Sequence, residues 1–357
     1  MTTPKEDDRP MQALPSAAVR IAGSGVAFPT CETPAGPKES IPTRFLLDLM
    51  TPEMSAARRE AVASHLAEAV GVDARAWARW CGAPPREDEA DSASLGTLAA
   101  TRALEAAGLA PKNIAGIVFA TSTPPKWTSA VSSIVAGKLG VTCPFFDVRS
   151  GCAGGAYAIA LASIIAASAR GPVLAIGADT FSKVLGPHER LLAMAMGDGA
   201  GALVLAPAPS GSGVRTALFG GDGALGELTS VPARLPPTAL DASEWQLTGN
   251  PERFGIEAER ALMNAARRLH GVREDGFDAC IVHAGQASIC RRVAAEVGAG
   301  DRVWLESLAR HGNVGAASLA VALHEARAAG FVKSGMRLAL ASVGGGISWA
   351  GLSWSEP

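Results

Sequence analysis

The feature that most constrains the fold is an internal duplication of the chain. The apolar run at residues 117–120 (IVFA) has a counterpart at residues 281–284 (IVHA), 164 positions later. Residues 171–176 have a counterpart at residues 335–340 with the same offset. A fixed offset between separate segments is the signature of a repeated structural unit. The chain of 357 residues is long enough for two such units.

A second alignment marks the middle of each unit. Residues 152–157 (CAGGAY) align with residues 313–318 (NVGAAS) at an offset of 161, which requires a gap of three residues. Each segment follows a strand pattern and a glycine and opens a helix of small residues. Short apolar strands that alternate with helices predict two α/β units, each with a mostly parallel sheet covered by helices. Two such sheets, related by a pseudo-twofold axis, would enclose the paired alanine-rich helices.

The duplication also sets the expected domain boundaries. The N-terminal half spans residues 19–206 and the C-terminal half residues 214–357, with a Pro/Ser/Gly-rich linker at 207–213. Residues 31–86 belong to neither repeat, and they carry several prolines and a helical pattern near residues 53–70. We interpret this segment as a surface excursion that could form part of a substrate lid.

Composition argues against several classes of protein. The 32 basic and 34 acidic residues nearly balance, and only 18% of residues are charged, which disfavours a nucleic-acid-coating surface and a disordered chain. The six cysteines include no CxxC pair, so we interpret them as free thiols in a reducing compartment. No His/Cys/Asp cluster has the spacing of metal ligands. The sequence therefore predicts neither a metal nor a nucleic-acid partner.

Two segments bear on location. Residues 1–18 form a polar segment that predicts a disordered arm, and they lack the apolar stretch of a signal peptide, so we expect a cytoplasmic protein. The uncharged run at residues 153–169 approaches the length of a membrane span. Because this run is rich in Ala, Gly and Ser and lies between strand patterns, a buried core helix is the preferred interpretation.

Cys152 is the candidate nucleophile. A strand pattern ending at residues 145–148 turns through Gly151 into a helix at Cys152, where the helix dipole would favour the thiolate. The alternative is a small buried cysteine, which is the commoner role of this residue. The glycine-hinged turn from strand to helix favours the nucleophile.

His283 and Asn313 are the candidate partners of this thiol. His283 ends a strand pattern, and its imidazole could accept the thiol proton or hold a carbonyl oxygen; the alternative is a structural histidine. Asn313 begins the second-half helix equivalent to that of Cys152, where a helix cap is the ordinary role of Asn. Equivalent strand ends and helix starts approach one another near a pseudo-twofold axis, so we expect the three residues to meet there.

Two apparent nucleotide-binding motifs fail on inspection. The sequence Gly23-Ser24-Gly25 has Phe28 where a dinucleotide fingerprint needs its third glycine. The glycine-rich run at residues 197–201 precedes a strand pattern rather than a helix. No Ser lies in a GxSxG turn. The remaining pattern predicts a thiol acyltransferase that uses no cofactor.

At these residues the chain resembles the ketoacyl-acyl-carrier-protein synthase III enzymes of the thiolase superfamily. The resemblance runs from about Val19 to Trp354 and rests on a set of motifs: FDVRSGCAGGAYA around Cys152, MGDGAGALVLA at Met196, LTGN ending at Asn250, IVHAGQA around His283, HGNVGAAS around Asn313 and SVGGGISWAG at Ser342. It implies a duplicated, five-layered αβαβα fold, a homodimer, and acyl-CoA or acyl-carrier-protein thioesters as partners.

The resemblance also implies roles for individual residues. Cys152 would take an acyl group from a thioester, while His283 and Asn313 would polarise the carbonyl of a malonyl-type thioester so that loss of carbon dioxide leaves a stabilised enolate. The backbone N–H of Cys152, with one from Gly345 or Gly346, would form a second oxyanion site used in acyl transfer.

Five further residues are implied in substrate binding. Arg190 matches a position near the coenzyme A adenine, and Trp77 and Arg79 resemble residues at the mouth of the pantetheine tunnel. Asn250 lies in the LTGN motif, and Trp127 lies in a loop that resembles one reaching across the dimer to floor the partner's acyl pocket.

Three departures from the family pattern favour a specialised pathway. The usual His-Gln-Ala-Asn becomes His283-Ala284-Gly285-Gln286, Arg149 stands three residues before the nucleophile where a small residue is usual, and the 31–86 excursion is long. We therefore expect carbon–carbon condensation in polyketide or other secondary metabolism. The alternatives are acyl transfer to a hydroxyl or amine without decarboxylation, and a catalytically silent partner subunit of a heterodimeric synthase.

Overall fold

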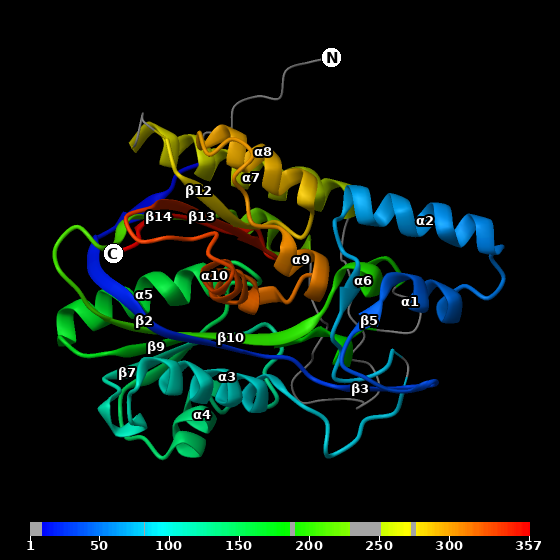
Figure 1. Cartoon of the computed structure of the whole chain (residues 1–357), viewed down its shortest axis with the longest axis horizontal. Helices are drawn as coiled ribbons and strands as arrows, with labels where there is room; N and C mark the ends of the chain where they lie inside the picture. The colour runs from blue at the N-terminus through cyan, green and yellow to red at the C-terminus, as the bar shows by residue number, and fades with distance from the viewer. Residues whose placement is uncertain (1–8, 82, 186–189, 229–250, 273–275) are drawn as a thin grey trace.

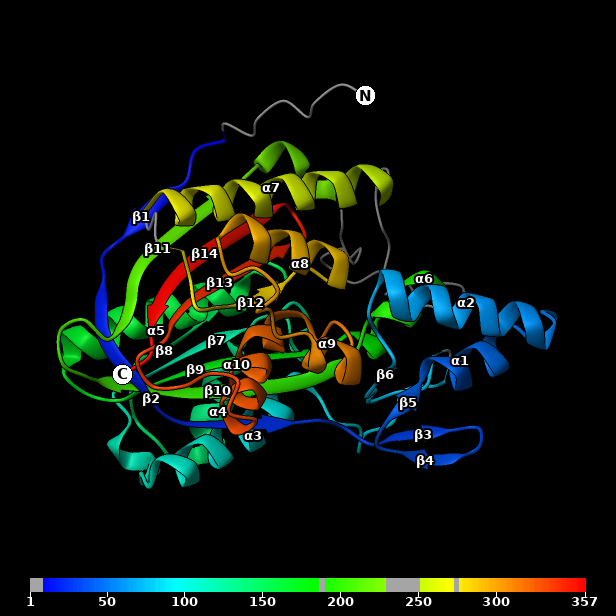
Figure 2. The ribbon, with the colours of Figure 1, turned by 45° about the horizontal axis from the view of Figure 1, so that its top comes forward.

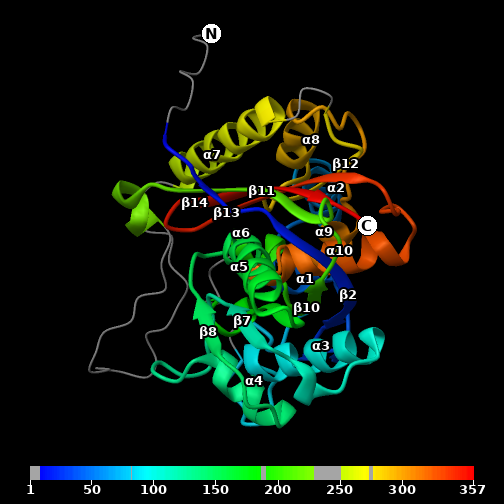
Figure 3. The ribbon, with the colours of Figure 1, turned by 90° about the vertical axis from the view of Figure 1, so that its left-hand side faces the viewer.

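In the computed structural model, two sheets alternate with three layers of helices (Figure 1). The structure describes residues 9–81, 83–185, 190–228, 251–272 and 276–357. The layers run helix, sheet, helix, sheet, helix, and the view in Figure 3 shows the same succession from a second direction. The predicted five-layered αβαβα fold is confirmed.

The N-terminal half builds strands in the order β2-β10-β9-β7-β8. The bounds are Ala17–Ala27 (β2), Gly116–Ala120 (β7), Phe145–Val148 (β8), Val173–Thr180 (β9) and Asp198–Pro207 (β10). Strand β7 is parallel to β8 and β9, whereas β10 is antiparallel to β9 and β2. Every residue of β7 and β9 is buried, as expected for strands covered by helices on both faces.

The C-terminal half repeats this plan in the order β12-β13-β14-β11. The bounds are Gly213–Gly221 (β11), Ala279–His283 (β12), Arg337–Gly344 (β13) and Ser348–Ser355 (β14). Only β12 and β13 are parallel; β14 is antiparallel to both β13 and β11. The prediction of mostly parallel sheets is therefore wrong. The short turn at residues 345–347 can join only antiparallel strands, since a parallel pair needs a long crossover.

Three helical layers cover the sheets (Figure 1). Helices α3 and α4 cover the outer face of the N-terminal sheet, α5 and α10 lie between the sheets, and α7 and α8 cover the outer face of the C-terminal sheet. The bounds are Ser92–Ala107 (α3), Val131–Leu139 (α4), Gly154–Ala169 (α5), Pro251–Val272 (α7), Ala287–Glu296 (α8) and Ser318–Ala328 (α10). Shorter helices are α6 (Arg190–Ala195) and α9 (Glu306–His311), with 3₁₀ turns at Pro111–Asn113 (η1), Phe181–Lys183 (η2), Gly223–Leu228 (η3) and Gly315–Ala317 (η4).

Helix α5 explains the apolar run that approaches membrane-spanning length. By length and composition alone, residues Gly151–Ala169 could cross a membrane. In the structure, α5 contacts strands of both sheets, and its residues belong to the largest apolar cluster of the fold. The prediction of a core helix at this position is confirmed.

The glycines of the apparent nucleotide motif serve helix packing. A Cβ on Gly23 would lie 2.3 Å from the carbonyl oxygen of Ala103, and one on Gly25 would lie 2.4 Å from that of Ala99. Both glycines are inside β2 and allow α3 to approach its backbone. This contact accounts for the motif without a nucleotide.

The excursion forms a subdomain at one end of the molecule (Figure 2). It contains β3 (Cys31–Thr33), β4 (Gly36–Lys38), β5 (Ile41–Pro42), α1 (Thr43–Met50), α2 (Ala56–Ala69) and β6 (Ala74–Arg75). Helix α2 corresponds to the predicted helical section, and Ser55 caps it by accepting a hydrogen bond from the backbone N–H of Arg58 at 3.3 Å.

The structure also corrects the expected N-terminal arm and locates the linker. Within the arm predicted at residues 1–18, Gln12–Leu14 form strand β1, which pairs antiparallel with β11. This outcome is not visible in the local sequence because the partner strand lies about 200 residues away. Residues 1–8 lie outside the described part. The linker expected at residues 207–213 is a short turn between β10 and β11, both of which pair with β2.

Candidate active site

Cys152 lies at the turn that leads from β8 into α5. Gly151 adopts a left-handed φ of +54°, which favours glycine, and α5 begins two residues after the cysteine. The backbone around Cys152 is held from the other half of the chain. Ser342 Oγ donates to the Cys152 carbonyl at 3.3 Å, and Ser348 Oγ donates to the Ser150 carbonyl at 2.8 Å.

The thiol of Cys152 is protonated at neutral pH. Burial raises its pKa to about 12, the nearby carboxylate of Asp179 adds to this effect, and a hydrogen bond from the Asn313 side chain opposes it. The expectation that the helix dipole would favour a resting thiolate is therefore wrong, because desolvation outweighs the dipole at this site. A reaction at Cys152 requires a base that takes the proton.

His283 is the predicted candidate for such a base. It is the last residue of β12 and pairs with Ser342 of β13, whose hydroxyl holds the Cys152 carbonyl. The imidazole side chain is 5% exposed, and burial lowers the pKa of His283 to about 4. His283 is thus neutral at pH 7, with one ring nitrogen able to accept a proton and the other able to donate a hydrogen bond.

Asn313 is fixed by its backbone and by its own side chain. Its N–H donates to the Ala195 carbonyl at 2.8 Å, and its carbonyl accepts from Gly197 N–H at 2.9 Å. Its Oδ1 accepts from Gly315 N–H at 2.9 Å, so the amide nitrogen is the end that remains for Cys152. The side-chain orientation therefore presents a hydrogen-bond donor to the thiol.

A glycine loop packs directly on the nucleophile. A Cβ on Gly344 would lie 2.7 Å from Cys152 N and 2.6 Å from Ser150 O, and a Cβ on Gly151 would lie 2.6 Å from Gly345 N. The structure thus brings Gly345 beside the Cys152 turn, as the oxyanion-site prediction requires. Gly346 has a φ of +75°, and its backbone N–H remains only a prediction as a donor.

Asp179 is a site residue that sequence analysis missed. Its buried carboxylate, at the end of β9, accepts from Thr121 and Thr123 hydroxyls, from Ser122 and Thr123 N–H groups, and from Ala316 N–H, at 2.7–3.0 Å. Desolvation raises the pKa of Asp179. The carboxylate ties the loop after β7 to the turn after Asn313. A polar residue ending an apolar strand, the signal that pointed to His283, would also have found it.

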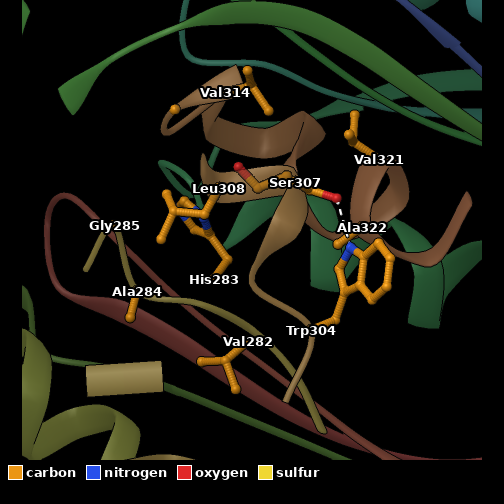
Figure 4. A pocket seen from close by; sticks show the side chains of 12 residues that line it. Val282, His283, Ala284, Gly285, Trp304, Ser307, Leu308, Val314, Val321 and Ala322 are labelled. Atoms are coloured by element: carbon orange, nitrogen blue, oxygen red, sulfur yellow. Dashed lines mark hydrogen bonds between the residues drawn. The ribbon is translucent and has the colours of Figure 1, made fainter. Parts of the chain in front are cut away.

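A small, partly open pocket lies beside His283 (Figure 4). Its lining includes Val282, His283, Gly285, Trp304, Ser307 and Leu308. In Figure 4 the Trp304 indole donates to Ser307 Oγ at 2.8 Å. Gly312 and Val314, which flank Asn313, also line the pocket. The pocket therefore borders His283 and the residues on either side of Asn313.

Comparison with known proteins gives the family. The C-terminal domain of 3-oxoacyl-[acyl-carrier-protein] synthase III matches residues 268–355, and a second domain of the same synthase matches residues 146–223. A β-ketoacyl-[acyl-carrier-protein] synthase III of Streptomyces coelicolor is 36% identical over 279 residues, covering 74% of this chain and 83% of the relative. The chain belongs to the β-ketoacyl-[acyl-carrier-protein] synthase III family.

Other relatives agree with this assignment. A synthase III of Rhizorhabdus wittichii is 34% identical over 268 residues, covering 72% of this chain and 82% of the relative. The crystal structure of the Aquifex aeolicus enzyme has a TM-score of 0.77 at 25% identity, covering 94% of this chain and 99% of that one. A priming β-ketosynthase from a polyketide biosynthetic pathway shares the fold, with a TM-score of 0.78 at 23% identity over 96% and 98% of the two chains. The resemblance inferred from the sequence is confirmed.

Trp77 and Arg79, which the resemblance to synthase III enzymes implicates in substrate binding, form hydrogen bonds inside the protein. Trp77 is fully buried, and its indole N–H donates to the Met196 carbonyl at 3.0 Å. Arg79 is paired with the buried Glu89 through bonds of 2.7–3.0 Å, and Lys183 lies 3.7 Å from the same carboxylate. Both side chains therefore have partners inside the protein, and their role at a tunnel mouth stays a prediction. The burial of these two side chains depends on packing between segments that are distant in the sequence, so the local sequence does not predict it.

The remaining substrate-binding predictions are placed as follows. Trp127 is 60% exposed in the loop between β7 and α4. Arg190 is the first residue of α6, and Asn250 lies outside the described residues. Of the family departures, Arg149 is exposed, and Gln286 forms the N-cap of α8 without a side-chain capping bond. In the described part of the chain, no group of three or more His, Cys, Asp or Glu residues could hold a metal ion.

Proposed function

We propose that this protein condenses an acyl group carried on Cys152 with a malonyl-type or β-keto carrier-bound thioester, in polyketide or other secondary metabolism. The supporting observation is that Gly315 N–H holds Asn313 Oδ1 at 2.9 Å, which leaves the amide nitrogen as the end that donates, while burial keeps His283 neutral. Two neutral donors are what the oxygen of a developing enolate requires. The three departures from the usual family pattern support a specialised pathway.

The first half-reaction loads the enzyme. Cys152 Sγ attacks the carbonyl carbon of an acyl thioester from coenzyme A or a carrier protein, and the thiol proton passes to His283. The oxyanion of the tetrahedral intermediate accepts hydrogen bonds from the N–H of Cys152 and from Gly345 or Gly346. The carbon–sulfur bond of the donor breaks, its thiol leaves with the proton, and His283 is neutral again.

The second half-reaction makes the carbon–carbon bond. The thioester oxygen of the malonyl-type donor accepts hydrogen bonds from His283 and Asn313. The bond to the carboxylate breaks, carbon dioxide leaves, and its electron pair forms the enolate. The enolate carbon attacks the acyl carbonyl on Cys152, the carbon–sulfur bond breaks, and the cysteine leaves as a thiolate that takes a proton from water to restore the resting thiol. A charged imidazolium is not needed, which agrees with the lowered pKa of His283.

We also propose that the active form is a homodimer. Strand β8 lies at the edge of the sheet, where its backbone groups are open to a further strand. Phe145 and Phe146 on this strand are 45% and 38% exposed, and Trp127 is a third exposed aromatic residue. A second copy paired along β8 would cover Phe145 and Phe146. A monomer by light scattering at micromolar concentration would contradict this arrangement.

One experiment separates condensation from simple acyl transfer. The protein is incubated with a panel of acyl and malonyl-type thioesters, and the Cys152 adduct mass and carbon dioxide release are measured on the same preparation. We expect wild type to do both and Asn313→Asp to keep the adduct. In that variant, carbon dioxide release should fall by about a hundredfold to a thousandfold, because one donor becomes an acceptor.

Two outcomes would contradict the proposed condensation. If wild type acylates Cys152 but releases no carbon dioxide from any donor, and instead acylates an alcohol or amine, then the acyltransfer alternative is correct. If it forms no adduct with any thioester, then the silent-subunit alternative takes its place.

A further inference from the structure

The excursion supplies a buried arginine that reaches the backbone supporting Asn313. Arg75, on β6, has no exposed surface. Its Nη1 donates to the Ile41 carbonyl at 3.2 Å, and its Nη2 donates to Thr43 Oγ1 at 2.9 Å and to the Met194 carbonyl at 2.6 Å. The last bond leaves the excursion and reaches α6. A buried guanidinium that binds carbonyls of two separate segments holds those segments at a fixed distance.

Met194 leads directly to the catalytic amide. The next residue, Ala195, accepts a hydrogen bond from Asn313 N–H at 2.8 Å, and Gly197 N–H donates to the Asn313 carbonyl at 2.9 Å. Met196, between them, forms a β-bridge with Asn313. The backbone of Asn313 is therefore anchored on the two residues that flank Met196, and Arg75 anchors the residue just before them.

The stem of Arg75 also packs against both glycines of this junction. A Cβ on Gly197 would lie 3.3 Å from the Arg75 Cβ, and one on Gly312 would lie 3.5 Å from it. Asp73 and Ala76, on either side of Arg75, also form backbone hydrogen bonds with the segments around this junction. Asp73 N–H donates to the Ala309 carbonyl at 2.9 Å, and the Ala76 carbonyl accepts from Asp198 N–H at 2.8 Å. The segment thus spans the site from α9 to the start of β10.

We propose that Arg75 is a positioning residue for Asn313, fixing the Met194–Gly197 backbone so that the Asn313 amide is aimed at the Cys152 thiol. The excursion is then a support for the amide side of the site, in addition to any role as a lid. The catalytic use of that amide rests on the proposed function, whereas its aim at the thiol does not.

The energetic argument favours a positional role. Arg75 makes no ion pair with a carboxylate among the described residues, its Nε has no hydrogen-bond partner there, and burial lowers its pKa to about 9. A buried cation that is hydrogen-bonded only to carbonyls and a hydroxyl carries a desolvation cost that the charge of Asp73 offsets only in part, so stability alone does not explain it. Its hydrogen bonds instead link β5, α1 and α6, whose relative positions must stay fixed at the site.

The test is a double-mutant cycle in which the reactivity of the Cys152 thiol is measured. Alkylation of Cys152 by iodoacetamide is measured against pH for wild type, Arg75→Met, Asn313→Ala and the double variant, because the Asn313 hydrogen bond lowers the pKa of the thiol. We expect both single variants to slow alkylation at pH 9 severalfold. The double variant should be no slower than Asn313→Ala, since Arg75 acts through Asn313. Effects that multiply in the double variant would overturn the proposal.

Two further variants address folding. Arg44→Met is the matched control, because Arg44 lies in the same excursion with its side chain 69% exposed in an ion pair with Glu60. It should leave alkylation unchanged. Thr43→Val removes one acceptor of Arg75, together with the bond that Thr43 Oγ1 donates to the Val72 carbonyl at 2.9 Å, and keeps the side-chain shape, so it should give a smaller effect of the same sign. If Arg75→Met does not fold, the cycle is run with Thr43→Val, and a normal alkylation profile in that folded variant would overturn the proposal.

A second readout keeps this inference separate from the proposed function. Carbon dioxide release is divided by the number of Cys152 sites that accept an acyl group, so that misfolded protein is not counted. We expect Arg75→Met to lower this rate by about tenfold to a hundredfold, which is less than the loss caused by removing a hydrogen-bond donor completely. Arg75→Lys should recover part of the lost rate. If wild type releases no carbon dioxide, the condensing function fails, while the alkylation cycle still decides the role of Arg75.

Discussion

Gly155 and Ala316 touch across the pseudo-twofold axis: a Cβ on Gly155 would lie 2.2 Å from the Ala316 carbonyl oxygen. The two positions are equivalent in the duplication, 161 residues apart, as are Cys152 and Asn313. Equivalent residues can meet only near the axis that relates the halves. The contact therefore places Cys152 and Asn313, each three residues earlier in its half, close to this axis.

The first prediction follows from this contact. Gly155→Ala should lower the free energy of unfolding by about 1–3 kcal/mol, because α5 must move away from the backbone at Ala316. It should also slow carbon dioxide release, since the same turn carries Asn313. Gly137→Ala is the control: nothing lies within 4 Å of a Cβ there, inside the exposed part of α4. That change should raise stability by about 0.5–1 kcal/mol in a denaturant titration. Equal stability of both variants would show that the close approach is not rigid.

The second prediction concerns the nucleophile. Because burial raises the pKa of Cys152 to about 12, the rate of its alkylation should rise about tenfold per pH unit from pH 7 to pH 10. Cys152→Ala should abolish the acyl adduct by intact mass, whereas Cys143→Ala, at another partly exposed thiol, should retain it. A flat profile between pH 7 and 10 would mean that the thiolate exists in the resting enzyme. An acyl adduct on Cys31 or Cys81 would show that the nucleophile is one of those cysteines and not Cys152.

The third prediction uses the pKa of His283, which burial lowers from 6.5 to about 4. The unfolded chain takes up a proton here below about pH 6.5, and the folded protein does so only near pH 4. Stability is therefore lost as pH falls through this window, by up to about 3 kcal/mol. His283→Gln should remove this loss. Asp198, with a pKa raised to about 6, acts in the opposite direction in both proteins and cancels in the comparison. Parallel stability curves from urea titrations at pH 4.5 and 7 would contradict the neutral imidazole.

The fourth prediction concerns Trp127. If this exposed side chain floors the acyl pocket of a partner subunit, Trp127→Ala should extend the range of accepted acyl chains while Cys152 remains reactive. Phe146→Lys, on the edge strand β8, should yield monomers that lose the same chain-length limit. Adduct yields across an acyl-thioester series, read beside the mass in solution, test both. Unchanged selectivity in Trp127→Ala would place the tryptophan on its own subunit.

Much of the site could be read from the sequence because the duplication acts at long range. Aligning the two halves predicted that Cys152 and Asn313 occupy equivalent positions, and the fold brings them into contact. The polar end of the strand 279–283 likewise pointed to His283. The repeat also predicted two α/β halves stacked around the alanine-rich helices, and the family resemblance implied the five-layered fold.

The rest depended on contacts that no local pattern records. Trp77 and Arg79 resembled substrate-binding residues, yet the backbone at Met196 and the carboxylate of Glu89 engage them. Arg75 drew no attention, since a single arginine in a region outside the repeat gives no sign that it will be buried against α6. The state of the Cys152 thiol was misjudged for a related reason: desolvation depends on everything packed around a group, whereas the helix start is visible in the sequence.

The location of Cys152 and Asn313 at equivalent positions has a consequence for how such a site can arise. Two identical half-length chains paired about a true twofold axis would place the same residue on both sides, giving two thiols or two amides. A thiol facing an amide needs the symmetry to be broken, and one continuous chain allows this because each half can accept substitutions of its own. The covalent join at the turn between β10 and β11 meets this need, because it keeps two halves of different sequence paired, so that a thiol and its hydrogen-bond donor share one locus.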